Sequence, residues 1–480
     1  MLQYRERYRP QYHFSAEHGW LNDPNGLVFF NGEYHLFYQH HPFGKTWGPM
    51  HWGHAVSKDL VHWQHLPVAL YPDHLGTIFS GSAVVDWSDT SGFFGGEPGL
   101  VAIFTHSEAR GQVQSLAYST DRGRSWKKYD GNPVLTQFAQ EDFRDPKVFW
   151  HEPTKQWIMV VAGGKVRIYS SPNLREWVLR SENEIWTECP DLFELAVDGD
   201  PRTTKWVLSL GGRKYYIGTF DGERFIPEIG PLPMNYGPDA YAAQTFNDEP
   251  RGRRIMISWM NNWEYANSLS SVTDPWNGTM TLPCELSLKT FPEGTRLVQR
   301  PVPELQQLRR AHRRFAGQTV RSGANPVAGL RGVQLEIIAE FETGTATEFG
   351  IKVRMGGEEE TVVGYRTADH VLFLDRNRSG QALSGVYEAP MIAENSRVKM
   401  HLFIDWSSLE VFGNDGKVAI TSLMFPDPAS DGVEVYATGG EVNLVSLDVY
   451  ELGSIWGEDE TTRRKQQCSS HGGMSRLLPK

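Results

Sequence analysis

Short runs in which apolar and polar residues alternate fill most of this chain, and amphipathic helical stretches are scarce. The runs are rich in Val, Ile, Tyr, Phe and Trp, and Gly, Asn, Asp and Pro separate them. A period of two places successive side chains on opposite faces of a strand, whereas a helix repeats its apolar positions every three or four residues. The pattern therefore predicts a nearly all-β protein.

A hairpin phrase recurs in the first half of the chain. It consists of an apolar strand, a Ser or Thr, a short turn with Asp or Asn, and an aromatic residue six or seven positions after the Ser or Thr. It occurs at residues 57–63, 119–126, 171–177 and, more weakly, 219–225, so the closing aromatic residues are 63, 51 and 48 positions apart. Periods of about 40 to 50 residues are typical of propeller blades, and longer steps reflect loop insertions. With the strand-like segment 241–263, the phrases predict a five-bladed β-propeller, the alternative being ordinary hairpins that recur by chance.

The second half of the chain has a different organisation. The repeats stop at about residues 301–315, a stretch rich in Pro, Gln and Arg that we interpret as a linker. Alternating runs follow at 332–343, 347–355, 397–412 and 432–450, with Gly and Asn-Asp-Gly turns between them, which indicates a β-sandwich. We therefore predict a propeller at 1–300, a linker at 301–315, a sandwich at 316–456 and a disordered tail at 457–480.

Composition narrows the class of function. The net charge of −11 and the lack of a long basic cluster argue against nucleic-acid binding, so a neutral or polar small molecule is the better ligand. The first ten residues lack the apolar core of a secretion signal, and no apolar run is long enough to span a bilayer. Three cysteines are no disulfide framework. We therefore expect a cytoplasmic protein that does not bind membranes, or a secreted one if a leader peptide was removed.

Three short acidic segments hold the candidate chemistry: WLNDPNG at 20–26, FRDP at 143–146 and ECPD at 188–191. Each opens a repeat, and the start of a blade is its innermost strand, beside the central channel. We therefore expect Asp23, Asp145 and Glu188 to meet in one pocket. Glycosidic bond cleavage needs two such carboxyls, because one attacks or stabilises the sugar cation while the other releases the leaving oxygen.

Each segment also has a purely structural interpretation. Asp-Pro and Asn-Gly pairs around Asp23 form turns by themselves, but Trp20, Gln39 and residues 47–52 add stacking and hydrogen-bonding groups suited to a sugar. Arg144 and Asp145 could form a simple buried ion pair. We favour a functional interpretation, in which Arg144 keeps the Asp145 carboxylate ionised so that its oxygens can accept hydrogen bonds from sugar hydroxyls.

Glu188 is the natural acid of the three candidates. Its neighbours Trp186, Cys189 and Pro190 predict an apolar frame that favours the protonated carboxyl.

A metal site is not expected, although ten of the 16 histidines fall in the first 74 residues. The pairs His51 with His54 and His62 with His65 would point to opposite faces of a strand, and no cysteine or acidic ligand completes a shell. No Gly-rich phosphate cradle is present either. We predict no metal and no organic cofactor.

At five positions the chain resembles glycoside hydrolase family 32, the invertase, inulinase and levanase group. The three acidic segments, FSGS at 79–82 and YAAQTF at 241–246 occur in the order of that family, and the chain is most similar in look to bacterial exo-levanases and β-fructosidases. The resemblance implies a five-bladed propeller followed by a β-sandwich, no metal or cofactor, and a retaining mechanism, for which the attacking and acid carboxyls lie about 5 to 5.5 Å apart.

The resemblance also implies a role for each site residue. Asp23 is expected to be the nucleophile, Glu188 the acid and base, and Asp145 the transition-state stabiliser. The expected substrate-binding residues are Trp20, Asn22, Gln39, Trp47, Phe79, Ser80, Arg144, Tyr241 and Trp263.

The favoured function is an exo-acting β-fructofuranosidase that hydrolyses terminal β-D-fructofuranosyl units of sucrose, inulin or levan. A fructosyltransferase is the first alternative, because a sugar hydroxyl can capture the same covalent intermediate. A sucrose-6-phosphate hydrolase is another, with Lys45, Arg213 and Lys214 as candidate phosphate partners. A non-catalytic sugar-binding propeller is disfavoured because all three carboxylates are present. The oligomeric state stays open, a dimer included.

Overall fold

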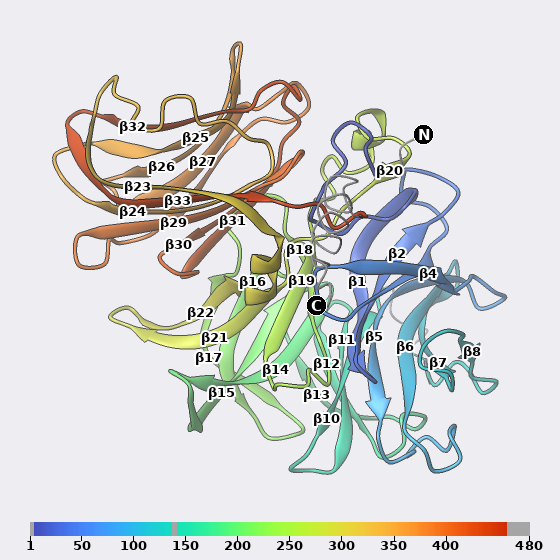
Figure 1. Cartoon of the computed structure of the whole chain (residues 1–480). Coiled ribbons are helices and arrows are strands. Elements are labelled where there is room, and N and C mark those ends of the chain that lie inside the picture. Colours follow the sequence, from blue (N-terminus) through green and yellow to red (C-terminus); the bar gives the residue numbers. More distant parts are fainter. Residues whose placement is uncertain (1–3, 137–141, 458–480) are drawn as a thin grey trace, which may run out of the picture.

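The computed structural model describes residues 4–136 and 142–457 and forms two lobes, a β-propeller and a β-sandwich beside it (Figure 1). The described helices are two short 3-10 segments, η1 (Ser268–Ser271) and η2 (Pro303–Leu308). None of the helices in these ranges is long and apolar enough to cross a membrane. Apart from Gly457, the predicted tail lies outside the described residues.

Five four-stranded antiparallel blades form the propeller, which confirms the predicted blade number. A single parallel pairing of Val197 with Leu288 joins the fourth and fifth blades into one sheet. The short β9 (Leu135–Thr136) extends the second blade, and β20 (Trp276–Asn277) pairs with β1. The blades, in chain order, are β1 (Gly19–Phe30), β2 (Glu33–His41), β3 (His51–Ser57) and β4 (Trp63–Leu70); β5 (Thr77–Asp86), β6 (Gly99–Glu108), β7 (Gly111–Ser119) and β8 (Lys127–Lys128); β10 (Arg144–His151), β11 (Gln156–Ala162), β12 (Val166–Ser171) and β13 (Val178–Asn183); β14 (Pro190–Val197), β15 (Asp200–Leu210), β16 (Lys214–Phe220) and β17 (Phe225–Pro233); β18 (Tyr241–Thr245), β19 (Arg254–Trp259), β21 (Cys284–Phe291) and β22 (Gly294–Pro301).

The hairpin phrase of the sequence is the turn between the third and fourth strands of a blade. In the first blade Asp59 accepts hydrogen bonds from the backbone N–H of Val61 at 3.0 Å and of His62 at 2.8 Å, which is how Asp stabilises a tight turn. The Trp63 indole closes this turn on the carbonyl of Leu60 at 3.1 Å. The closing tryptophans of the second and third blades donate to a carbonyl three residues back in the same way. The repeated sequence phrase therefore corresponds to the same turn in four of the blades.

The ring closes between the fifth blade and the first. Asn247, just beyond β18, exchanges backbone hydrogen bonds with Leu27 at 2.9 Å and Phe29 at 3.0 Å of β1. Its side-chain amide also donates to the carbonyls of Ala83 and Val148 in the second and third blades. One asparagine thus ties four blades together at the channel, which holds the inner strands in place.

Two packed sheets form the sandwich, and their facing apolar side chains make a core that includes Ile337, Phe341, Ile351 and Leu402. Each of the four predicted runs contains strand, and the last two cover two strands each. One sheet holds β23 (Arg309–Arg321), β33 (Glu441–Leu452), β24 (Leu335–Glu342), β29 (Arg397–Ile404), β30 (Ser408–Gly413) and β31 (Val418–Leu423), and the other holds β28 (Val386–Pro390), β27 (Val371–Arg378), β26 (Glu359–Arg366), β25 (Glu348–Gly356) and β32 (Gly432–Thr438).

The linker predicted at 301–315 is wrong in its second part. Residues 303–308 form η2, but β23 already begins at Arg309 and pairs with β33, so that Phe315 lies opposite Leu447. This edge strand is polar because its arginines face solvent or carboxylates, as Arg309 does with Glu336 at 2.6 Å. An edge strand rich in charge resembles a loop in composition.

His13 fastens the segment before β1 to the sandwich. Its two ring nitrogens lie 2.8 Å from Asp405 and 3.0 Å from Glu410, and all three side chains are buried. Burial alone opposes protonation, but the two carboxylates outweigh it and raise the pKa of His13 to about 9. The imidazolium is therefore part of the contact between the two lobes.

Replacing His13 with Gln is expected to flatten the loss of stability that the wild type shows between pH 6.5 and 9. The pKa of folded His13, about 9, exceeds its ordinary value of 6.5. The stabilisation is therefore fully present below pH 6.5 and is lost as the pH rises through 9, by on the order of 3 kcal/mol. Urea unfolding midpoints of both proteins at pH 6, 7.5 and 9 measure it. Parallel pH profiles of the two proteins would contradict a charged His13.

Candidate active site

The amino ends of the five inner strands meet around a pocket of about 330 Å³. Each inner strand begins at this end, so residues at the start of β1, β5, β10, β14 and β18 come together although they are far apart in the sequence. Eleven of the twelve site residues expected from the sequence line the pocket: Asn22, Asp23, Gln39, Trp47, Phe79, Ser80, Arg144, Asp145, Glu188, Tyr241 and Trp263. The convergence of the three acidic segments is a property of the fold.

Asp23 lies where β1 bulges between Leu21 and Pro24. Ser80 donates to one carboxylate oxygen at 2.6 Å, and the Asn22 amide donates to the other at 2.9 Å. Burial raises the pKa of Asp23, while these two hydrogen bonds oppose the rise. The carboxylate is thereby held in one orientation at the pocket wall.

Asp145 occupies a second bulge, at the start of β10, with a left-handed φ of 62°. Its own N–H donates to Thr105 at 3.2 Å, and its Oδ2 accepts from the N–H of Cys189 at 2.9 Å. Burial raises the pKa of Asp145 to about 7, although the nearby Arg144 opposes it, and the Asp23 charge adds to the rise. Arg144 therefore favours the ionised form of Asp145, as expected, but it offsets only part of the effect of burial.

Glu188 has polar partners rather than the apolar frame expected from its neighbours. Arg144 Nη2 donates to one oxygen at 2.8 Å, and the Tyr241 hydroxyl donates to the other. Trp186 contributes nothing to a frame, since 66% of its surface is exposed. Glu188 is thus positioned between a guanidinium and a phenol, with its carboxyl open to the pocket.

Arg144 links the acidic groups of the site. Besides Glu188, its guanidinium contacts Asp142, and its Nε lies 3.8 Å from Asp145. Burial alone would lower the pKa of Arg144, but these carboxylates outweigh it and raise that pKa, so the side chain stays charged. Arg144 is therefore the cation that Asp142, Asp145 and Glu188 share.

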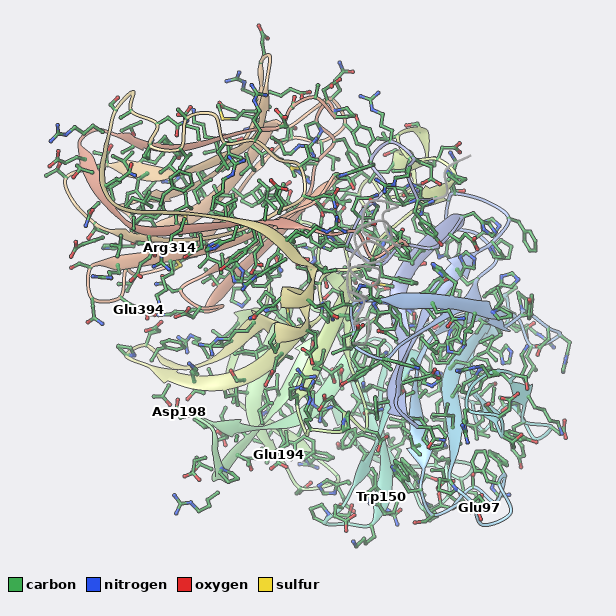
Figure 2. All side chains as sticks on the ribbon, in the orientation of Figure 1. Glu97, Trp150, Glu194, Asp198, Arg314 and Glu394 are labelled. Carbon is green, nitrogen blue, oxygen red and sulfur yellow. The ribbon has the colours of Figure 1, made fainter. Side chains whose placement is uncertain are left out.

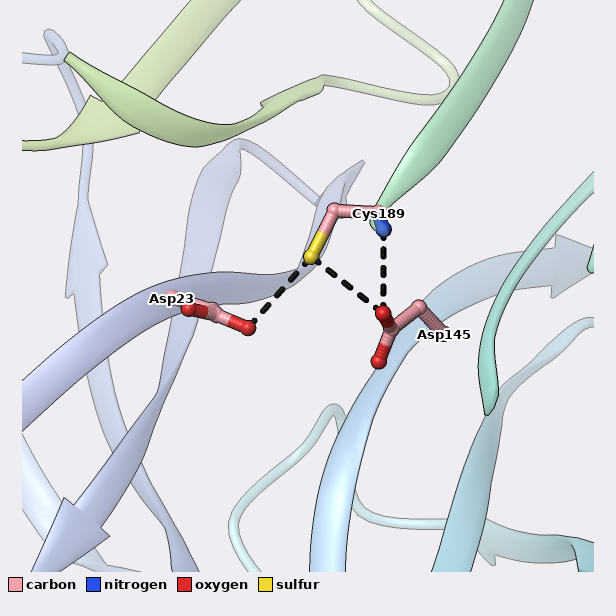
Figure 3. A group of neighbouring side chains, drawn as sticks. All are labelled: Asp23, Asp145 and Cys189. Carbon is pink, nitrogen blue, oxygen red and sulfur yellow. Dashed lines mark hydrogen bonds between the residues drawn. The ribbon is translucent and has the colours of Figure 1, made fainter. Parts of the chain in front are cut away.

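Two further residues line the pocket, Cys189 and Gln112, and neither was predicted from the sequence as a site residue. The Cys189 thiol points between two carboxylates, with Sγ 3.4 Å from Asp23 and 3.5 Å from Asp145 (Figure 3). Cys189 directly follows Glu188 in the segment ECPD, so its position in the sequence could have indicated a place in the site. Gln112, at the start of β7, accepts a hydrogen bond from the N–H of Phe143 at 2.7 Å and belongs to no motif.

The group Asp23, Asp145 and Cys189 has its ligand atoms within 4.8 Å of one another, close enough to surround a metal ion. Metal coordination needs the thiolate. Burial and the neighbouring carboxyls raise the pKa of Cys189 well above its ordinary value, so the thiol keeps its proton and donates it to them. The thiol therefore acts here as a hydrogen-bond donor to the carboxylates of Asp23 and Asp145.

Trp20 is the one expected binding residue that does not line the pocket. It is fully buried, donates to Asn22 at 2.7 Å and stacks on Trp263 with ring centroids 6.0 Å apart. Its contacts give it a positioning role behind the wall, while Trp47 and Trp263 are exposed at the mouth.

The sandwich supports the segment that carries Trp263. Arg376 of β27 reaches the fully buried Asp239, with Nη1 2.9 Å from its carboxylate. Asp239 also accepts hydrogen bonds from the Asn262 amide at 3.1 Å and from the Tyr265 hydroxyl. These two residues flank Trp263 in sequence, so the second lobe braces one wall of the pocket.

The basic residues considered as phosphate partners lie elsewhere. Lys45 donates to the carbonyls of Ser270 and Thr273, and Arg213 donates to the carbonyls of Gly237 and Pro238. Neither they nor Lys214 line the pocket. The site therefore offers Arg144 as its cation, and that cation is already paired with carboxylates.

Gln244 links three blades beside the pocket. Gln244 of β18 donates to the carbonyl of Gly81 at 3.0 Å and accepts from the N–H of Leu27 at 3.1 Å, so it connects the fifth blade to the second and the first. A pocket of about 330 Å³ that is lined by carboxyls and has aromatic rings at its mouth suits one terminal sugar unit, with the rest of the molecule outside. That geometry suits cleavage at a chain end.

Comparisons with known proteins assign nearly the whole chain to one family. Residues 13–301 match the glycosyl hydrolases family 32 N-terminal domain, and residues 304–451 match the family's C-terminal domain. The chain is 49% identical to a levanase of Bacillus subtilis, over 95% of this chain and 72% of that protein, and 36% identical to an extracellular exo-inulinase of Aspergillus niger, over 94% and 96%. A solved exo-inulinase from Aspergillus awamori superposes with a TM-score of 0.88 at 35% identity, covering 94% of this chain and all of that one.

Proposed function

The chain belongs to glycosyl hydrolase family 32, and from that premise we propose that it is a retaining, exo-acting β-fructofuranosidase that releases terminal fructose from β-fructans and sucrose. The observation that carries the proposal is the single pocket that Asp23, Asp145 and Glu188 line together. Its volume of about 330 Å³ suits a single monosaccharide unit. The levanase and exo-inulinase relatives support a fructan as substrate.

The proposed reaction has two steps. A carboxylate oxygen of Asp23 attacks the anomeric carbon of the terminal fructosyl unit while Glu188 gives its proton to the departing glycosidic oxygen. Water then attacks the same carbon, Glu188 takes the proton from that water, and the bond to Asp23 breaks. Each step inverts the configuration, so the product keeps the β configuration of the substrate.

The other groups hold the sugar in place for this reaction. Asp145 accepts hydrogen bonds from sugar hydroxyls, and its charge stabilises the oxocarbenium-like transition state. Arg144 and Tyr241 orient Glu188 through their hydrogen bonds to its two oxygens. Trp47 and Trp263 offer ring faces at the mouth, where the leaving group lies.

The expected products test this function. Incubation with levan, inulin and sucrose should release free fructose from the first time point, with no series of oligosaccharides. In the presence of methanol the enzyme should form methyl β-D-fructofuranoside, because the intermediate on Asp23 is captured from the same face. Early oligosaccharides or the α-anomer contradict the proposal. Oligosaccharides that outweigh fructose at high sucrose indicate transfer, and a clear preference for sucrose 6-phosphate indicates the phosphate-specific alternative.

A further inference from the structure

A second and larger hollow, of about 990 Å³, opens at the other end of the propeller channel. Its walls include the carboxyl ends of two inner strands, Val84 to Asp86 of β5 and Phe149 to His151 of β10, and the middle of a third, Leu192 to Glu194 of β14. The amino ends of these strands lie at the catalytic pocket. Trp150 and Glu194 lie at this end in Figure 2, away from the sandwich. Among the described residues the hollow and the catalytic pocket share no lining side chain.

Two tryptophans at this hollow have open surfaces but fixed rings. Trp87 is 57% exposed and Trp150 is 37% exposed. The indole N–H of Trp87 donates to Asp248 at 2.8 Å, and that of Trp150 donates to Glu152 at 2.7 Å. An exposed indole ring adds little to the stability of the fold. An exposed tryptophan whose N–H is held by a hydrogen bond is therefore typical of a binding surface.

Packing also orients both rings. Trp87 meets Phe30 edge to face at 5.9 Å between centroids, and Trp150 meets Trp157 edge to face at 5.1 Å. Each ring therefore loses little conformational entropy when a ligand stacks on it. Flat, preorganised indole surfaces are suited to the C–H face of a sugar ring.

The charges of the hollow select for a neutral ligand. Six carboxylates line it against three basic side chains, so anions such as phosphates or nucleic acid are repelled. All three basic residues are already engaged: Arg253 pairs with Glu249 at 2.9 Å, Arg254 donates to the carbonyl of Phe246 at 3.2 Å, and Lys155 pairs with Glu152. Carboxylates accept hydrogen bonds from neighbouring hydroxyl groups, which a polyol supplies in pairs.

We propose that this hollow is a second carbohydrate site, which binds a segment of a neutral β-fructan chain on Trp87 and Trp150. The choice of fructan among neutral polysaccharides rests on the proposed function. The hollow has about three times the volume of the catalytic pocket, so it accommodates a few sugar units of a polymer rather than one chain end. Holding the polymer here keeps further chain ends near the enzyme after each cleavage and raises their effective concentration.

Binding is tested in the full-length Asp23→Asn protein, so that no substrate is consumed. Affinity electrophoresis in gels that contain levan, inulin or dextran measures the dissociation constant for each polymer. We expect retardation by levan or inulin but not by dextran. Trp87→Ala and Trp150→Ala together should raise the dissociation constant about tenfold or more, since both stacking surfaces are lost.

Matched variants separate stacking from folding. Trp87→Phe and Trp150→Phe should keep most of the binding, and Ile392→Ala, an exposed apolar residue outside the hollow, should keep all of it. In the active enzyme the double alanine variant should lower kcat/KM for levan several-fold through KM and leave sucrose hydrolysis unchanged. Thermal unfolding midpoints show whether each variant is folded.

The site is overturned if the folded double alanine variant is retarded as strongly as the protein with both tryptophans. It is also overturned if the phenylalanine variants lose as much retardation as the alanine variants. Equal retardation by dextran overturns the assignment to fructan. The binding readout does not depend on catalysis. A protein that hydrolyses no fructan but binds levan through these tryptophans would therefore refute the proposed function and leave the second site in place.

Discussion

Replacing Asp23 with Asn is expected to lower kcat for sucrose and levan by about 10⁴-fold or more, because the amide cannot form the covalent bond to the anomeric carbon. Asn has nearly the same shape as Asp and can still accept the hydrogen bond from Ser80, which is 2.6 Å in the wild type. Initial rates of fructose release measure the loss. Burial of an acid whose pKa is raised costs stability, so the variant should unfold at the same temperature as the wild type or slightly above it.

Asp130→Asn is the matched control for this substitution. Asp130 is exposed and pairs with Lys127 at 3.1 Å on the surface, so its loss should leave kcat unchanged. A folded Asp23→Asn protein that keeps a tenth of the wild-type rate refutes the role of Asp23 as nucleophile. Trapping of a fructosyl ester on Asp23 in denatured wild-type enzyme, seen by mass spectrometry, would identify the attacking oxygen directly.

Replacing Glu188 with Gln should lower kcat by about 10² to 10⁴-fold, the usual contribution of a general acid and base. The amide oxygen can still accept from Arg144, which donates at 2.8 Å in the wild type, so the pocket should keep its shape. Because Gln has no proton to give, the loss should be largest for substrates whose leaving group is a poor one, such as a sugar. Rates measured with sucrose and with an aryl β-fructofuranoside separate the two cases.

Azide provides an independent readout for Glu188. This small anion attacks without the help of a base, so it should restore turnover of the Glu188→Gln variant on an activated substrate and produce a β-fructosyl azide. Glu184→Gln is the matched control, because Glu184 is exposed only four residues away and pairs with Lys165 on the surface. If the Glu188 variant loses the same factor on both substrates and azide has no effect, Glu188 is not the acid and base.

Much of the fold was accessible from local patterns. The hairpin phrase marks a turn whose hydrogen bonds join residues two or three positions apart, as between Asp59 and Val61, so it is visible in the sequence alone. Four such turns, together with the strand-like segment 241–263, predicted five blades. The phase of each acidic segment in its repeat then predicted that Asp23, Asp145 and Glu188 meet, because every blade begins beside the channel.

Local patterns failed where the surroundings of a side chain come from other blades. The neighbours of Glu188 in sequence suggested an apolar frame, but its partners Arg144 and Tyr241 come from β10 and β18. Arg144 precedes Asp145, yet burial by several blades decides the pKa of that carboxyl. Composition likewise hid the edge strand β23 inside a stretch that resembled a linker.

The sequence by itself determined the repeat, the blade number and the identity of the three carboxyls, since these depend on residues close together along the chain. Only the tertiary structure decided which oxygen each donor contacts, that Trp20 stands behind the pocket wall, and that the Cys189 thiol lies between two carboxylates. It also revealed the second hollow, whose tryptophans belong to different blades. Contacts between blades are set by ring closure and burial, which involve residues that no local pattern connects.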